Sequence, residues 1–155
     1  MNTTTDYTGR LVDIEYLKAI RVPEGSQSVK IALVDPAIVT GIEKLVQKYT
    51  LLFLTPTGSV QFDSEFGTPF TQAIINGTLV NYGQLYAEFA YANTLVVRAM
   101  LADVADLPDD EIIDTAVLVD SNIDFANSTL MLTILLTTAA GTSAKFVIPT
   151  SIVKV

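Results

Sequence analysis

The order in which helical and extended patterns follow one another constrains this chain more than any single motif does. Apolar residues fall at helical spacing in residues 42–53 and again in residues 85–104. Three runs rich in β-forming residues then follow, at 112–119, 129–138 and 144–148. Because helices and strands are segregated along the chain, we predict an α+β fold in which two main helices pack on a C-terminal three-stranded antiparallel sheet.

The length of the chain predicts a single domain. Its 155 residues can bury one core but are too few for two comfortable ones. Extended segments at 11–22 and 29–34 predict short N-terminal strands, and the polar, Thr-rich residues 1–10 predict a flexible arm. We therefore expect one domain at residues 11–149, followed by a short C-terminal arm at 150–155.

Capping patterns mark the start of both predicted helices. In Thr40-Gly41-Ile42-Glu43 the Thr40 side chain is expected to accept a hydrogen bond from the backbone of Glu43 while Glu43 reaches back. Asn81-Tyr82-Gly83-Gln84 offers the same arrangement. Behind these caps, one face of each helix is apolar and is expected to lie in the core: Ile42, Leu45, Val46, Tyr49, Leu52 and Phe53, and then Leu85, Phe89, Ala92, Val96, Ala99 and Met100.

A long loop, residues 56–69, separates the two predicted helices. Loops of this length are usually functional or packed against something. Gly58 and Gly67 permit backbone angles that residues with side chains resist. Three aromatic residues are expected to pin the loop onto the helices: Phe62, Phe66 and Phe70.

The residue inventory excludes most catalytic chemistry. With no histidine and no cysteine, the chain can form neither a Ser-His-Asp triad, nor a Cys-His dyad, nor a common zinc site. It also has no Walker loop and no Gly-x-Gly-x-x-Gly motif, so we expect no cofactor. The net charge of −8 argues against binding to nucleic acid or an anionic membrane. Half of the residues are hydrophobic and only 17% are charged, so we expect a surface with protein partners.

Carboxylate chemistry is the catalytic possibility that the inventory leaves open. A glycoside hydrolase needs only two acids a few ångströms apart, and Asp63 or Glu65 with Glu111 are the candidates. The ordinary interpretation is that Asp63 and Glu65 are solvated loop acids and that Glu111 marks the start of a strand. We expect the chain not to be an enzyme.

Four segments follow one another in a recognisable order: Lys30–Val34, Thr40–Gln47, Leu51–Ser59 and Phe62–Thr68. Together they resemble the baseplate wedge or sheath-initiator proteins of contractile phage tails, a family also found in type VI secretion baseplates. In that family a strand leads into a Gly-Glu-x-Leu-x-Gln helix start, a Leu-Leu-Thr-x-x-Gly break and an acidic-aromatic-Gly loop before a long helix. The resemblance extends from about Ala32 to Ile148. The family's usual Glu-Pro-Arg before the first sheet strand is absent, and Leu107–Ile113 stands in its place.

The resemblance implies a structural protein of the virion tail baseplate, made in the host cytoplasm. It would dock in the wedge and nucleate the sheath through its C-terminal sheet. Its partners would be other wedge proteins and the tail sheath protein, with the tail tube as a further candidate. Members are often labelled lysozyme-like, but the motif requires no acid pair, so we do not transfer that activity. A glycan hydrolase and a small adaptor protein on the same fold are the alternatives.

The C-terminal segment, residues 144–155, is predicted to bind a partner. Residues 144–155 are rich in β-forming residues with two charged side chains, both lysines, so an exposed edge here is expected to pair with strands of a sheath-like partner. Because Pro149 has no amide N–H, pairing should stop there and leave residues 150–155 as an arm that crosses to a neighbour. The predicted partner-binding residues are Phe62, Phe66, Gly67, Phe70, Glu111, Phe146, Ile148, Ile152 and Val153.

Overall fold

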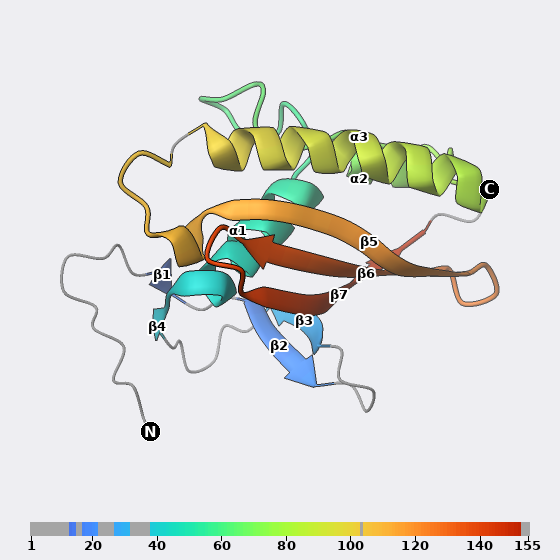
Figure 1. Ribbon diagram of the computed structural model, residues 1–155. Coiled ribbons are helices and arrows are strands. Elements are labelled where there is room, and N and C mark those ends of the chain that lie inside the picture. Colours follow the sequence, from blue (N-terminus) through green and yellow to red (C-terminus); the bar gives the residue numbers. More distant parts are fainter. Residues whose placement is uncertain (1–12, 15–16, 22–26, 32–37, 103, 153–155) are drawn as a thin grey trace.

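The computed structural model describes residues 13–14, 17–21, 27–31, 38–102 and 104–152, and these form an α+β fold (Figure 1). The predicted N-terminal arm, residues 1–10, lies outside the described residues. The strands are β1 (Asp13–Ile14), β2 (Leu17–Arg21), β3 (Gln27–Ile31), β4 (Ile38–Val39), β5 (Ile113–Asp124), β6 (Thr129–Thr138) and β7 (Ser143–Ser151). The helices are α1 (Gly41–Leu54), α2 (Phe70–Ile75), α3 (Tyr82–Leu101) and the short 3-10 turn η1 (Asp109–Glu111).

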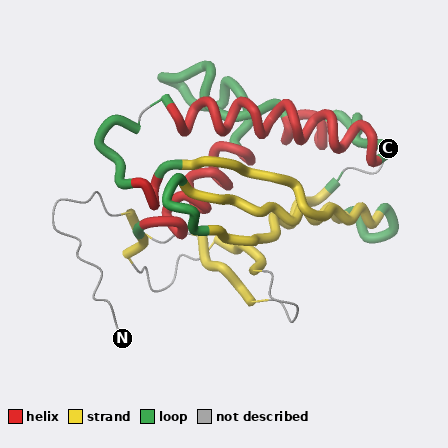
Figure 2. Tube along the Cα trace, viewed as in Figure 1, coloured by secondary structure: helices red, strands yellow, loops and turns green. Residues whose placement is uncertain are grey.

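The sheet contains the predicted antiparallel meander and two additional strands. Its order is β2-β3-β7-β6-β5, and β5, β6 and β7 pair antiparallel as predicted (Figure 2). Strand β3 pairs parallel to β7 at Gln27 and Ser28, so the N-terminal strands extend the same sheet. Strand β5 runs five residues beyond its predicted end and carries register shifts on the way. Strands β1 and β4 form a separate pair.

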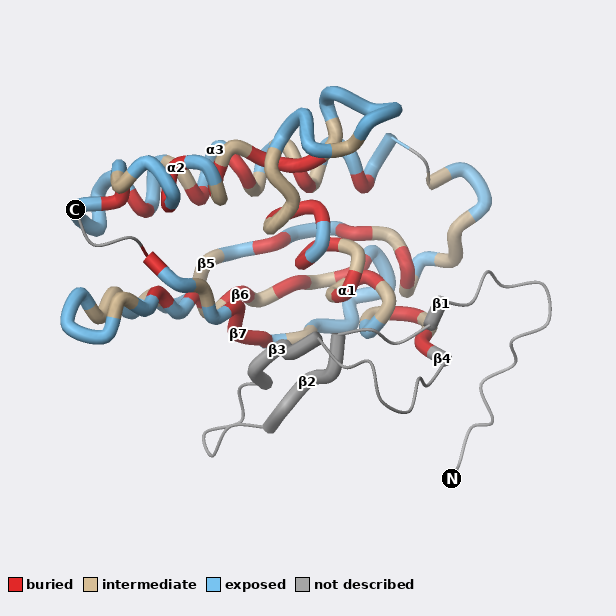
Figure 3. Tube along the Cα trace, turned by 180° about the vertical axis from the view of Figure 1, so that it is seen from behind, coloured by how far each residue is buried: buried red, intermediate tan, exposed pale blue. Residues whose placement is uncertain are grey.

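The core lies between one face of this sheet and the three α-helices. Alternate residues of β6 are fully buried, as the period of two in a strand requires: Leu130, Leu132, Ile134 and Leu136. The predicted apolar faces of α1 and α3 meet this layer, and burial follows the same pattern in Figure 3. Ala99 is the exception, because it is exposed. The short helix α2 was not predicted, since six residues are too few for a helical period to show.

The two predicted helix caps have different outcomes. At α3 the Asn81 cap is confirmed, because the Asn81 side chain accepts from the Gln84 N–H at 2.9 Å, whereas the Gln84 side chain accepts from the Val80 N–H at 3.2 Å. At α1 the helix starts where predicted, but the Thr40 side chain makes no capping hydrogen bond. The Gly41 N–H at the start of α1 instead donates to the Glu111 side chain.

A chain of polar contacts links α1, α3 and β5 inside the core. The Tyr49 hydroxyl donates to Asn93 Oδ1 at 2.7 Å, and Asn93 Nδ2 donates to the Ala116 carbonyl at 2.9 Å. Burial raises the pKa of the Tyr49 hydroxyl above its usual range, because the charged phenolate loses its solvation. Tyr49 therefore stays neutral and serves as a donor that joins the two long helices.

The predicted interruption of β7 at Pro149 is wrong. Pairing with β6 continues through Pro149 to Ser151, and the Ile152 N–H donates to the Ser128 carbonyl at 2.9 Å. Because amide groups alternate between the two sides of a strand, Pro149 points its missing N–H away from β6. The proline therefore leaves the β6 ladder intact. Thr150 to Ile152 belong to the fold, and residues 153–155 lie outside the described residues.

Candidate functional site

The loop that follows α1 is held to the last turn of that helix by backbone and side-chain hydrogen bonds. The Thr68 N–H donates to the Thr55 carbonyl at 2.8 Å, and the Thr57 N–H donates back to the Thr68 carbonyl at 3.1 Å. The Thr68 hydroxyl is fully buried and donates to the Phe53 carbonyl at 2.7 Å. These bonds close the base of the loop.

Gly67 occupies the tightest point of this closure. Its φ of +95° lies in a region that residues with a Cβ rarely adopt, and a Cβ here would meet the Thr55 carbonyl oxygen. Gly58 also has a positive φ, +78°, but a Cβ there would meet nothing. The predicted conformational role of both glycines is confirmed, and only Gly67 is required by close approach as well.

The tip of the loop is ordered by Asp63. One carboxylate oxygen of Asp63 accepts from the N–H groups of Glu65 and Phe66, each at 3.1 Å. The Asp63 N–H donates to the Val60 carbonyl at 3.3 Å. The acid therefore works as a turn-forming residue, which is a common role of aspartate in loops.

The three aromatic residues of this region have three different environments. Phe70 is fully buried, with its ring centroid 4.7 Å from that of Phe53. Phe66 is half-buried and packs against the core. Phe62, by contrast, is 93% exposed. The prediction that all three pin the loop therefore holds for Phe66 and Phe70 but not for Phe62.

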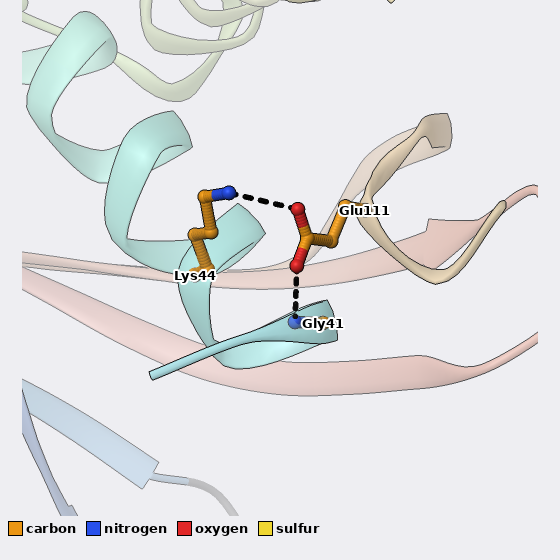
Figure 4. Close-up of polar contacts among 3 residues, drawn as sticks. All are labelled: Gly41, Lys44 and Glu111. Carbon is orange, nitrogen blue, oxygen red and sulfur yellow. Dashed lines mark hydrogen bonds and ion pairs between the residues drawn. The ribbon is translucent and has the colours of Figure 1, made fainter. Parts of the chain in front are cut away.

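The opposite end of α1 is held by a buried carboxylate. Glu111, 3% exposed, accepts from the Gly41 N–H at 3.1 Å through one oxygen and from Lys44 Nζ at 2.8 Å through the other (Figure 4). A carboxylate at a helix N-terminus compensates the partial positive charge there. Glu111 thus replaces the cap that Thr40 was expected to provide. The sequence gives no signal for this, because Glu111 lies 70 residues after Gly41.

The candidate catalytic acids lie at opposite ends of α1, with Glu111 at one end and Asp63 and Glu65 at the other. Glu111 contacts the first residue of the helix, whereas Asp63 and Glu65 belong to the loop fixed to its last turn. The 14 residues of α1 span about 20 Å at 1.5 Å per residue. Paired glycosidase carboxylates lie within about 10 Å of each other. This arrangement does not bring the proposed acids together.

A groove of about 760 Å³ lies between the C-terminal half of α3 and the start of β5. Its charged side chains are Arg98 and Asp114, so it supplies one acid and one base rather than two acids. In the part of the chain that the structure describes, no group of three His, Cys, Asp or Glu residues could hold a metal ion. No helix among the described residues is long and apolar enough to span a membrane.

The predicted partner-binding residues of the C-terminal sheet are mostly internal. Phe146, Ile148 and Ile152 are buried in the core, and Val153 lies outside the described residues. Strand β7 is not an edge strand at Phe146 and Val147, because β3 pairs with it there. In the described residues this pairing ends before Pro149, whose missing N–H faces that side. The stretch that follows is therefore poorly suited to accept a partner strand.

The other edge of the sheet, along β5, is covered by α3. The Asn93 side chain occupies the Ala116 carbonyl, and the Tyr82 hydroxyl lies 3.5 Å from the Ile123 N–H. Coverage by a helix is a common protection of an edge strand against uncontrolled pairing. The large apolar side chains exposed on β5 and β6 are Val117, Val119 and Met131, and Val117 also lines the groove beside α3.

Comparisons with known proteins find similarity among solved structures. No family model matches the chain, and no curated protein matches it. Among solved structures, a crystal structure from Geobacter sulfurreducens of a protein provisionally named a tail lysozyme is similar to this chain, with 14% identity and a TM-score of 0.49. The similarity covers 76% of this chain and 97% of that one.

Proposed function

We propose that this chain is a structural component of a contractile phage tail, placed in the baseplate wedge and not acting as an enzyme. The observation that carries the proposal is the loop at the end of α1. The Leu51–Ser59 and Phe62–Thr68 segments that resemble the wedge family meet at one point, where Gly67 lies against Thr55. This closure accounts physically for Gly67 and for Phe66, which packs against the core, but not for the exposed Phe62.

The non-enzymatic part of the proposal is supported by how the candidate acids are used. Both oxygens of Glu111 are engaged with Gly41 and Lys44, and one oxygen of Asp63 holds the loop tip. These are structural contacts, and they leave the proposed acids at opposite ends of α1. The alternative of a glycan hydrolase loses the support of the acid pairs proposed for it, Glu111 with Asp63 or Glu65. A small adaptor on the same fold would use the same surfaces, so genomic context and tail composition distinguish it.

Sheath nucleation is the finer part of the proposal. Because β7 lies inside the sheet and α3 lies along the edge of β5, a sheath-like partner is proposed to contact side chains exposed on β5 and β6 rather than the edge of β7. Val117, Val119 and Met131 would provide the apolar contacts.

The test is whether the chain belongs to assembled tails. Tails are purified from cells that express the gene cluster surrounding this gene, with and without a deletion of the gene. We expect mass spectrometry and a density map to place the chain in the baseplate, and the deletion to leave tails without sheath. Absence of the chain from intact, sheathed tails would contradict the proposal. Release of peptidoglycan fragments by the purified chain, lost in Glu111→Gln, would favour the hydrolase.

A further inference from the structure

Phe62 differs from every other large apolar side chain of the described surface. It is 93% exposed, whereas the next most exposed, Val80 and Tyr91, are 58% exposed. Single exposed apolar residues are common on soluble proteins, so exposure alone decides nothing. What matters is the loop that carries this one.

That loop presents Phe62 in a fixed position. Its base is closed by the Thr55–Thr68 hydrogen bond, and the residues directly after Phe62 are ordered by the Asp63 carboxylate. Phe66 and Phe70, on the far side of the tip, fasten the loop to the core. A residue whose backbone is already ordered loses less conformational freedom on binding, and this pre-organisation favours affinity.

The charges around Phe62 indicate the chemistry of its partner. The loop from Pro56 to Pro69 contains Asp63 and Glu65 and no lysine or arginine. Both acids are exposed. An apolar pocket rimmed by basic side chains would complement this tip, because opposite charges at the rim guide association and exclude wrong partners.

We propose that Phe62 is the anchor of a protein interface, inserted into an apolar, basic-rimmed pocket of a different tail protein. The inference rests on the proposed function for the identity of that partner as a tail protein. On this proposal Phe66 and Phe70 fasten the loop to the core, whereas Phe62 binds the partner.

The test uses full-length chain supplied to cells in which the gene has been deleted, with the amount of chain per purified tail as the readout. Phe62→Ala is expected to lower that amount at least about tenfold, the size of a moderate interface hot spot. The matched control is Phe125→Ala, an exposed phenylalanine on the β5–β6 hairpin, which should leave it unchanged. Unfolding of each purified variant should match that of the wild type.

The charge argument is tested in the same assay. Glu65→Lys should lower incorporation, whereas Glu43→Lys, an exposed acid on α1, should not. If Glu65→Lys and Glu43→Lys lowered incorporation equally, the proposed basic rim of the partner's pocket would be contradicted.

The outcomes separate this inference from the proposed function. If wild-type chain is present in tails and Phe62→Ala is incorporated equally well, the inference fails and the proposed function stands. If wild-type chain is absent from tails, the proposed function is contradicted, and so is the inference that the partner of Phe62 is a tail protein. Self-association in sedimentation equilibrium that disappears in Phe62→Ala would identify a second copy as the occupant and overturn the commitment to a different protein.

Discussion

The two ends of helix α1 are fixed by opposite means. At its start, a long-range side-chain contact from Glu111 reaches Gly41 and Lys44 in a buried setting. At its end, local backbone contacts fold the following loop against Thr55, and the tip of that loop is open to solvent. Both ends are well held, and the second end carries the most exposed large apolar side chain of the described residues, Phe62.

The difference separates stability from binding. Glu111 is 3% exposed and accepts hydrogen bonds from Gly41 and Lys44, so it contributes to the stability of the fold. The partner-binding role expected of it stays a prediction. The internal hydrogen bonds of the loop fix its backbone, and the Phe62 side chain remains exposed to solvent. Substitution of Glu111 or of the residues that hold the loop should therefore affect unfolding, whereas substitution of Phe62 should affect assembly.

The largest effect on stability is expected for Gly67→Val at the loop base. A Cβ there would meet the Thr55 carbonyl, and a β-branched residue cannot adopt the positive φ without strain, so we expect a loss of about 4 kcal/mol in the free energy of unfolding. Urea unfolding of purified protein measures it. Gly58→Ala is the matched control, because its φ is also positive but its Cβ position is open, and it should cost about 1 kcal/mol. Equal costs would show that close approach to Thr55 is unimportant.

Glu111→Ala at the other end is expected to cost about 3 kcal/mol, because it removes the acceptor for the Gly41 N–H and the partner of Lys44, whose side chain is only 17% exposed. Thermal melting followed by circular dichroism gives the comparison with wild type. Asp109→Ala, an exposed acid in the same short turn, should change stability by less than about 0.5 kcal/mol. If Glu111→Ala left the melting temperature unchanged, the buried contacts of Glu111 with Gly41 and Lys44 would not be important for stability.

Asp63→Ala is expected to have an intermediate effect, about 1 kcal/mol, because it removes the acceptor for the Glu65 and Phe66 N–H groups at an exposed site. Asp63→Asn keeps an oxygen acceptor and should cost less. Chemical denaturation of both variants tests whether hydrogen bonding rather than charge holds the tip. The reverse order would indicate that the charge of Asp63 is what matters.

The smallest effect on stability is expected for Phe62→Ala, less than about 0.5 kcal/mol, since the side chain is almost fully solvated in the fold. Phe70→Ala, which empties a fully buried site, should cost about 4 kcal/mol in the same measurement. This pair sharpens the contrast between the aromatic residue that is exposed and one that builds the core. A strongly destabilised Phe62→Ala would mean that Phe62 packs somewhere on this chain.

Local patterns in the sequence were sufficient for much of the fold. The apolar stripes of α1 and α3, the antiparallel meander, the Asn81 cap and the positive φ of Gly58 and Gly67 all follow from spacing and residue type within a few positions. Helical and strand periods act over short distances, so neighbouring residues alone specify them. The absence of histidine and cysteine likewise excluded Ser-His-Asp triads, Cys-His dyads and common zinc sites from the sequence alone.

Only the tertiary structure decided how distant segments meet. The Glu111 contact with Gly41 joins residues 70 positions apart, and the parallel pairing of β3 with β7 joins segments more than 100 residues apart. The same packing leaves Phe62 in solvent while it buries Phe70, although both are phenylalanines of one short region. Residue type sets what each side chain prefers, but whether a preference is met depends on which segments the folded chain brings alongside, and no local pattern records that.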